Sequence, residues 1–486
     1  MERLSYSALE SLAYDGYLLK EAPERVIQFG EGNFLRAFVD NFFDLANEIS
    51  GFNGKVVVVT PNSGRNVGKF NEQDCLYTLY LRGIENGEKR EQKRLISVLS
   101  RCINGVDCFQ QVLDCASNPE LKFVVSNTTE AGICFRSTDC FDEPGRASYP
   151  GKLTRFLYER YQKLGLEDAP GFILLPCELI EHNGDALKAC VLQYGELWDL
   201  GSGFASWIHN SNAFCSTLVD RIVPGFPKDD ALRYQQENGY EDVLMDAAEL
   251  FGFWAIEGDS SLNDILPFTR SGLPVLVTPD ITFYKRRKVC ILNGGHTSMT
   301  CAALLSGVQT VGQCMEDPDI SRFLHQAVYN EIIPANDLPK DALCDFAKDV
   351  MDRFRNPFIR HELISITLNT TSKWRARVLP SLKAYVQVFG KLPPLLCFGF
   401  AANIMFVRCG KFDVSDSPEV LSFFADHCDD CLAALCRSFC GQTAFWGEDL
   451  GMIPGFVEAV TADLEAIDRV GARAALSALL ERVENA

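Results

Sequence analysis

The stretch "VIQFGEGNFLRAF", residues 26–38, decides the expected fold of the first part of the chain. An apolar run leads into Gly30 and Gly32, and a segment with helical spacing follows. In dinucleotide-binding folds the first glycine permits a tight turn, the second lets the backbone approach a pyrophosphate, and the helix N-terminus supplies N–H groups. A third glycine is usual at position 35, which is Leu35 here. The glycines therefore predict a dinucleotide site, with a plain strand-to-helix turn as the alternative.

Further short apolar runs follow, separated by amphipathic helical segments: "KVVVVTP" (55–61), "RLISVLS" (94–100), "KFVVSNTT" (122–129) and "GFILLPCE" (171–178). Strands of this kind predict a parallel sheet covered by helices on both faces. From about residue 285 the apolar residues recur at helical spacing to the end of the chain. We therefore predict an α/β fold with an expanded Rossmann-like domain, residues 1–284, and a mainly α-helical domain, residues 285–486.

The composition limits the classes of partner. Of the 486 residues, 47% are hydrophobic, which is enough for two packed cores. The 65 acidic residues against 46 Lys plus Arg give a formal charge of −19, which repels nucleic acids and anionic membranes. The sequence shows no signal peptide and no apolar run of membrane-spanning length, and its nineteen cysteines suit buried thiols. We expect a cytoplasmic protein without nucleic-acid or membrane partners, either a monomer or a homodimer.

Candidate cofactor-binding residues stand at the ends of two predicted strands. They are Gly30, Gly32, Asn33, Phe34 and Arg36 after the first strand, and Asn127 and Thr128 in "SNTTEAG" (126–132). Arg36 could reach a phosphate. The second strand ends without the carboxylate that usually binds the adenosine ribose, and Arg65 follows it, so NADP is not excluded beside NAD.

Three polar side chains interrupt the apolar segment "KVCILNGGHTSM", residues 288–299. Reduction of a ketone by hydride builds negative charge on oxygen, which needs a proton donor and aligned hydrogen-bond donors. Lys288 could donate the proton, Asn293 could donate to the oxygen, and His296 could position a hydroxyl. If a helix begins near Asn293, then Asn293 and His296 share one face. In the structural alternative Lys288 lies on a basic surface, Asn293 and Thr297 cap a helix, and His296 is a core residue.

Four stretches carry a family resemblance: residues 30–37, "STLVDRIVPG" (216–225), "FWAIEG" (253–258), and Lys288, Asn293 and His296 at their spacing. With them the chain resembles the polyol-specific long-chain dehydrogenase/reductase family, which contains mannitol 2-dehydrogenase and hexuronate reductases. The resemblance implies zinc-independent hydride transfer between NAD(H) and a keto-hexuronate, favouring D-tagaturonate and D-altronate. D-Fructuronate reduction and mannitol 2-dehydrogenase activity are the enzymatic alternatives, and a sugar-acid-binding regulatory protein is the alternative without catalysis.

The substrate carboxylate needs cations, and "NTTSKWRARVLPSL" (369–382) supplies Lys373 and Arg377 on one helical face, although a solvated surface would look the same. Where mannitol 2-dehydrogenase-like sequences have Cys-Asp-Asn, this chain has Leu179 in place of the asparagine, and Asn183 is the nearest substitute.

A metal site is the remaining alternative. The cluster is His427, Cys428, Cys431, Cys436 and Cys440. Its cysteines follow one apolar helical pattern, so we predict packed thiols and no metal.

Overall fold

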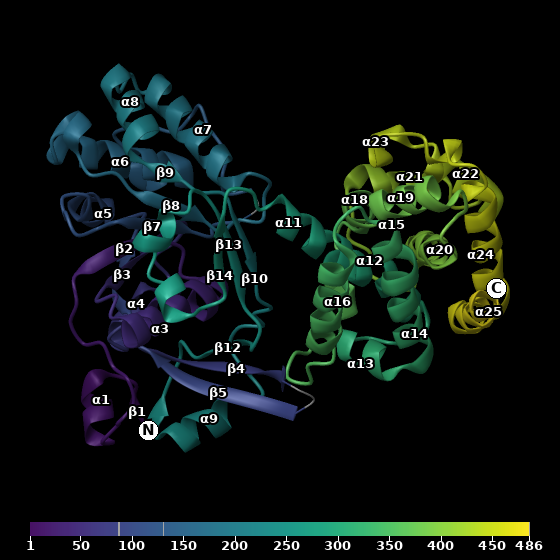
Figure 1. The fold of residues 1–486 in the computed structure, drawn as a ribbon, viewed down its shortest axis with the longest axis horizontal. Helices are drawn as coiled ribbons and strands as arrows, with labels where there is room; N and C mark the ends of the chain where they lie inside the picture. The colour runs from purple at the N-terminus through teal and green to yellow at the C-terminus, as the bar shows by residue number, and fades with distance from the viewer. Residues whose placement is uncertain (86–87, 130, 486) are drawn as a thin grey trace. The chain divides into compact units, whose positions relative to one another are not determined.

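The computed structural model describes residues 1–85, 88–129 and 131–485, and the chain divides into two compact units (Figure 1). Unit 1 comprises Met1–Gly83 and Lys89–Ile281, and unit 2 comprises Ile84–Glu88 and Thr282–Ala486. The main division falls between Ile281 and Thr282, slightly before the boundary that we predicted after residue 284, because all of helix α11 belongs to unit 2. Each unit is described separately.

Unit 1 is built on a six-stranded parallel sheet in the order β6-β3-β2-β7-β8-β9. The strands are β2 (Glu24–Phe29), β3 (Lys55–Thr60), β6 (Leu99–Asn104), β7 (Phe123–Ser126), β8 (Ile173–Pro176) and β9 (Ala213–Phe214). The order is that of the doubly wound dinucleotide-binding fold, in which the two halves of the sheet meet at the first strand. Pairing of Phe29 with Ser126 brings the carboxyl ends of β2 and β7 to the same edge. The α/β prediction is confirmed.

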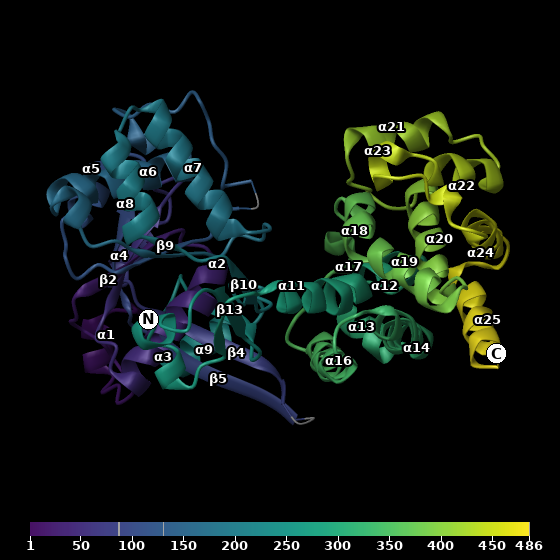
Figure 2. The same cartoon turned by 45° about the horizontal axis from the view of Figure 1, so that its top comes forward.

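Both faces of this sheet are buried, because successive side chains of a strand point to opposite sides. Ile27 and Val57 belong to a core covered by α5 (Phe109–Cys115), α6 (Tyr149–Lys163), α7 (Asn183–Leu197) and α8 (Ser202–Ser211), which lie together in Figure 2. Val26 and Val56 face the opposite core, formed with α2 (Asn33–Leu35), the π-helical η1 (Arg36–Asp40) and α3 (Asn41–Ser50).

Among the described residues, unit 1 has three further sheets that were not predicted: the two-stranded pair of Glu2–Arg3 with Tyr240–Glu241, and two three-stranded sheets. One has the order β12-β4-β5, with β4 (Tyr77–Glu85), β5 (Glu88–Ile96) and β12 (Asp246–Glu249); the other has the order β10-β13-β14, with β10 (Thr217–Asp220), β13 (Phe253–Glu257) and β14 (Val275–Thr278). The stretch "RLISVLS", predicted as one strand, is divided between β5 and β6. Most of β5 is exposed and charged, so it lacks the apolar alternation on which strand prediction depends.

The smaller elements of unit 1 lie around these sheets. They are β1 (Glu2–Arg3), α1 (Tyr6–Ser11), α4 (Val67–Glu72), η2 (Pro144–Arg146), η3 (Leu166–Asp168), α9 (Ala231–Asn238), β11 (Tyr240–Glu241), α10 (Leu262–Ile265) and η4 (Thr269–Ser271).

Unit 2 is mainly helical from Thr282 onward, as predicted. Its helices are α11 (Thr282–Lys288), η5 (Val289–Asn293), α12 (Gly294–Leu305), α13 (Val311–Glu316), α14 (Pro318–Gln326), η6 (Ala327–Ile332), α15 (Ile333–Ala335), α16 (Lys340–Phe354), α17 (Leu363–Ile366), α18 (Thr370–Arg377), α19 (Leu379–Phe389), α20 (Pro394–Arg408), α21 (Pro418–Asp426), α22 (Leu432–Cys440), α23 (Thr443–Trp446), η7 (Leu450–Met452), α24 (Phe456–Val470) and α25 (Ala472–Glu484). Helix α20 is apolar nearly all round and packs against α12 and α24, so it forms the centre of the unit. Within residues 1–85, 88–129 and 131–485, no helix has the length and apolar character needed to cross a bilayer.

Candidate active site

The glycine turn after β2 requires glycine at one position for packing. Gly30 has φ +130°, and a Cβ there would lie 3.1 Å from the carbonyl oxygen of Asn127. Gly32 precedes α2 with φ −66°, and a Cβ there would meet no protein atom within 4 Å. Protein packing therefore does not explain the missing side chain at Gly32. The close approach of a dinucleotide pyrophosphate would explain it, and the turn fits that group.

The structure gives Arg36 a different position from the one that we predicted. Its guanidinium donates to the Leu244 carbonyl and, over 2.5 Å, to Asn33 Oδ1, and it lies 3.6 Å from Asp246 Oδ2. Arg36 is also buried, so its donors serve the interior of unit 1 and do not reach toward a phosphate. Phe34 stacks on Phe38 with the ring centroids 5.1 Å apart. Arg36 thus supports the turn from inside unit 1, whereas the cofactor contacts expected of Asn33 and Phe34 stay predictions.

A buried carboxyl group lies beneath this turn. The Tyr77 hydroxyl is 3.2 Å from Asp40 Oδ2 and 2.8 Å from the Arg36 carbonyl, and Gln28 Nε2 donates to the Gly30 carbonyl over 3.2 Å. Asp40 is fully buried, and this burial raises its pKa from 3.8 to about 8, although Tyr77 and Arg36 act in the opposite direction. At neutral pH the folded protein therefore holds Asp40 mainly in its protonated form.

Asp40 makes the stability of the protein depend on pH. Because its pKa is higher in the folded than in the unfolded chain, its contribution to the free energy of unfolding falls as pH rises from about 4 to about 8. We expect Asp40→Asn to gain stability relative to wild type by up to about 1.4 kcal/mol per pH unit across this window. Urea unfolding at pH 5, 6, 7 and 8 measures the difference, and Asp15→Asn, an exposed acid, is the matched control. Parallel curves for wild type and Asp40→Asn would contradict the expectation.

The turn after β7 is held by a carboxylate that sequence analysis did not single out. Glu178 Oε1 accepts from both the backbone N–H and the hydroxyl of Thr128 over 3.0 Å, and Oε2 accepts from Ser126 Oγ over 3.0 Å. Only 2% of Glu178 is exposed, and burial raises its pKa. Glu178 therefore joins the ends of β7 and β8 and orients Thr128, whereas Leu179 is exposed.

Asn183 does not face a ligand in the structure. Its Nδ2 donates to the carbonyl oxygens of Pro176 and Glu178 over 2.9 and 3.0 Å, and its Oδ1 accepts from the Thr217 N–H over 2.8 Å. The side chain is fully buried, with both faces of the amide engaged. These bonds leave no polar group of the Asn183 side chain for the substrate contact that we predicted. Asn183 instead fixes the loop between β8 and α7.

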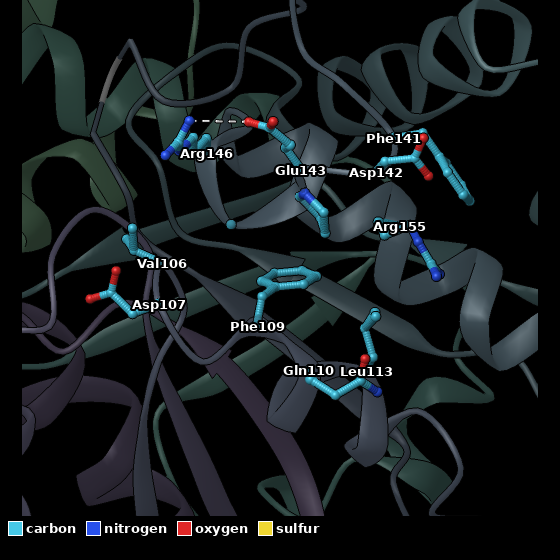
Figure 3. A pocket seen from close by; sticks show the side chains of 12 residues that line it. Val106, Asp107, Phe109, Gln110, Leu113, Phe141, Asp142, Glu143, Arg146 and Arg155 are labelled. Carbon is cyan, nitrogen blue, oxygen red and sulfur yellow. Dashed lines mark hydrogen bonds and ion pairs between the residues drawn. The ribbon is translucent and has the colours of Figure 1, made fainter.

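A cavity of about 430 Å³ lies at the carboxyl ends of β3 and β7, where open α/β sheets bind ligands. Its lining includes Pro61, Asn62, Thr128, Arg136, Arg146 and Tyr149. A second cavity of about 510 Å³ shares Val106, Gly145 and Arg146 with it, and Figure 3 shows the ion pair of Arg146 with Glu143 on its wall. The two cavities thus adjoin along one side of unit 1.

The second strand of the sheet, β3, ends without a carboxylate of its own, but a carboxylate from another segment lies near its end. Glu31, between the two glycines, accepts from Asn66 Nδ2 at 3.5 Å, and Asn66 lies just before α4 in the segment that follows β3. Partial burial raises the pKa of Glu31. Glu31 comes from the glycine turn and not from the end of the strand, where a ribose-binding acid is usual, so the strand pattern gave no sign of it.

In unit 2 the three candidate catalytic residues follow one continuous helical path. Lys288 ends α11, the π-helical turn Val289–Asn293 comes next, and His296 lies in the first turn of α12. Residues five apart point about 140° away from each other in an α-helix. In a π-helical turn, closed by i→i+5 bonds, they lie on nearly the same side. The π turn therefore aligns Lys288 with Asn293.

The structure contradicts one part of the structural alternative, the capping role of Asn293. Asn293 is within the helix, with φ −72° and ψ −39°, and it makes no capping bond. His296 is only 5% exposed, and its Nε2 has no hydrogen-bond partner among the described residues. Burial, together with nearby positive charges, lowers the pKa of His296 well below its ordinary value. A neutral imidazole with an unsatisfied nitrogen is suited to a hydrogen bond with a ligand hydroxyl or carboxylate.

The surroundings of His296 include both predicted and unpredicted residues. Its ring stacks on Phe354 at 4.0 Å and meets the ring of His361 edge to face at 5.2 Å. Three cations lie close enough to lower its pKa: Arg353, Arg377 and Lys373. The structure therefore brings Lys373 and Arg377 near His296. His361 and Arg353 were missed, because no sequence pattern links them to α12.

The cysteine-rich segment of unit 2 does not gather into one centre. Cys428 and Cys431 are exposed, Cys436 and Cys440 are buried on α22, and His427 Nδ1 bonds Asp430 at 2.7 Å. In the described part of the chain, no three His, Cys, Asp or Glu side chains form a group that could hold a metal ion.

Comparison with known proteins agrees with this arrangement. The mannitol dehydrogenase Rossmann domain matches residues 24–268, and the mannitol dehydrogenase C-terminal domain matches residues 280–468. An altronate oxidoreductase of Klebsiella pneumoniae (strain 342) is 46% identical over 468 residues, covering 94% of this chain and 97% of that protein. An altronate oxidoreductase of Bacillus subtilis (strain 168) is 41% identical over 471 residues, covering 96% and 97%.

Two solved structures share the fold. Mannitol 2-dehydrogenase of Pseudomonas fluorescens, in a ternary complex with NAD and D-mannitol, has a TM-score of 0.75 at 22% identity and covers 99% of both chains. A substrate-free D-sorbitol dehydrogenase has a TM-score of 0.81 at 21% identity, covering 97% of this chain and 100% of that one.

The strand order, the glycine turn and the helical unit with its lysine, asparagine and histidine define a dinucleotide-binding oxidoreductase. The chain belongs to the mannitol dehydrogenase family. The family membership predicted from four sequence stretches is confirmed.

Proposed function

We propose that the protein interconverts D-tagaturonate and D-altronate with NADH and NAD as the electron carrier. The observation that carries the proposal is the match to altronate oxidoreductases at 46% and 41% identity over nearly the whole chain. The cation-rich surroundings of His296 support it, because a hexuronate is an anion and the protein as a whole carries a formal charge of −19. Local cations offset that repulsion at the place where the substrate would bind.

The bound dinucleotide supplies or accepts a hydride at the substrate carbon. In the reducing direction Lys288 gives a proton to the carbonyl oxygen as the hydride reaches the carbon, so the C=O bond becomes CH–OH. Asn293 donates its amide N–H to the same oxygen while negative charge develops there. Neutral His296 hydrogen-bonds a neighbouring hydroxyl, and Lys373 and Arg377 attract the carboxylate. In oxidation Lys288 takes the proton back.

NAD is the proposed cofactor. Gly30 and Gly32 would hold the pyrophosphate, while Asn127 and Thr128 would line the nicotinamide half. Glu31 supports NAD over NADP, because a carboxylate near the end of β3 accepts hydrogen bonds from ribose hydroxyls and repels a 2′-phosphate.

A substrate panel tests the proposal. We expect NADH oxidation, followed by absorbance, to be fastest with D-tagaturonate, slower with D-fructuronate, and slowest with D-fructose and D-tagatose. NADPH should support a clearly lower rate than NADH. A higher kcat/KM with D-fructuronate or D-fructose than with D-tagaturonate would show that D-tagaturonate is not the preferred substrate. Absence of turnover with every ketose would contradict the proposed activity.

A further inference from the structure

Two imidazole rings in unit 2 lie in contact, and the proposed chemistry uses only one of them. His296 and His361 meet edge to face with their centroids 5.2 Å apart, and Phe354 covers the other side of His296. Among the described residues, neither ring hydrogen-bonds another group, and Nε2 of His296 is buried. Buried polar atoms in native proteins nearly always have a partner, so this pair is suited to a ligand.

The position of His361 is fixed by its backbone. The Val311 N–H donates to the His361 carbonyl over 3.0 Å, and the Leu363 N–H donates to the Gln309 carbonyl over 2.8 Å. These bonds flank the short antiparallel bridge between Thr310 and Glu362. Main-chain pairing therefore fixes the backbone at His361, and its ring contacts His296 of α12. A preorganised ring loses little conformational entropy when it binds a ligand.

The charges around the pair are positive. Arg353, Arg377 and Lys373 all act on His296, and Lys373 also acts on His361. Lys373 Nζ is oriented by the Ile366 carbonyl at 2.8 Å. Arg353 also acts on Asp349, one turn earlier on α16, and Asp349 is not among the main groups acting on either histidine. Such a field disfavours a metal cation and favours a carboxylate.

We propose that His361, packed against His296 and surrounded by Arg353, Lys373 and Arg377, is a specificity-determining residue that recognises the carboxylate of a sugar acid. This inference rests on the proposed function, because it assigns the anionic end of that substrate to a specific group. The neutral imidazole offers a carboxylate oxygen a directional N–H in addition to the donors and positive charge of the three cations. A neutral ketose has no anionic oxygen to offer in return.

Kinetics of His361→Asn tests the assignment. We expect KM for D-tagaturonate to rise about tenfold or more, the loss typical of one hydrogen bond to a charged group, with kcat changed by less than about threefold. For D-tagatose, which has a hydroxymethyl group in place of the carboxylate, kcat/KM should stay near wild type. His325→Asn, on the exposed side of α14, is the matched control and should behave as wild type. An unchanged KM, or equal losses with both sugars, would overturn the role.

A binding experiment separates failure of this inference from failure of the proposed function. The chain has six histidines, so imidazole ¹⁵N signals are few enough to assign with His361→Asn. Titration of the full-length protein with D-altronate should shift the signals of His296 and His361 and raise the pKa of both, whereas D-altritol should not. If wild type reduces no ketose but these shifts occur, the anion site stands and the proposed reaction fails. If D-altronate leaves both signals unmoved, the inference is wrong.

Discussion

Lys288→Ala should reduce kcat by about 10²–10⁴-fold or more, because the variant lacks the group that gives a proton to the developing alkoxide. Binding of NADH, measured by fluorescence titration, should stay near wild type, since Lys288 belongs to α11 of unit 2 and the glycine turn belongs to unit 1. The loss should appear with every ketose that the enzyme accepts. This pattern differs from that of His361→Asn, which depends on the substrate carboxylate.

Two further measurements test whether the loss of kcat comes from the missing amine of Lys288. Lys348→Ala removes an exposed lysine from α16 of the same unit and should keep full activity. Small primary amines added to the Lys288→Ala protein should restore part of the rate, because they can occupy the space of the missing side chain and transfer the proton. A variant that retains most of its kcat would show that another group is the proton donor.

Gly32→Val should weaken NADH binding by about tenfold or more while leaving the free energy of unfolding within about 0.5 kcal/mol of wild type. A Cβ at Gly32 meets no protein atom within 4 Å, and the backbone there is extended, so the fold tolerates a side chain. The added methyl groups would instead occupy the space that we assign to the pyrophosphate. Fluorescence titration with NADH and urea unfolding measure the two quantities.

Gly312→Ala provides the control for this second change. Gly312 lies in α13 and also has no protein atom within 4 Å of a built Cβ, so the substitution should alter neither quantity. Normal affinity in Gly32→Val would exclude the close approach of the dinucleotide at this position. A large loss of stability would show that packing, and not a ligand, selects glycine there.

The main sheet could be predicted because its strands satisfy a simple physical rule. β2, β3, β7 and β8 are buried on both faces, and each appears in the sequence as a short apolar run bounded by turn residues. β5 does not appear as such an apolar run, because residues 88–93 are exposed and polar. The helical spacing near the C-terminus does not show where one helix ends and the next begins, because α24 and α25 are divided at Gly471, which adopts φ +83°.

The sequence could show which types of residue belong to the candidate site. It could not show in which direction each side chain points. The sequence places Arg36 after a glycine turn, where a phosphate contact is reasonable. A π-helical turn begins at Arg36, and its guanidinium lies near Asp246, far away in the sequence. The same limit applied to Asn183, whose partners lie at the end of β8 and on β10, and to His361, which approaches His296 only through tertiary packing.

The π-helical turn between Lys288 and Asn293 means that chain length, and not only residue identity, specifies this site. An ordinary α-helix over the same residues would turn Asn293 about 140° away from Lys288, because the two are five positions apart. Loss of one intervening residue would make the spacing four, which an α-helix places on one face, so the deletion and the loss of the π turn would compensate each other. A homologous sequence that keeps the three residues at this shorter spacing should therefore have the same side chains on one side of an α-helix.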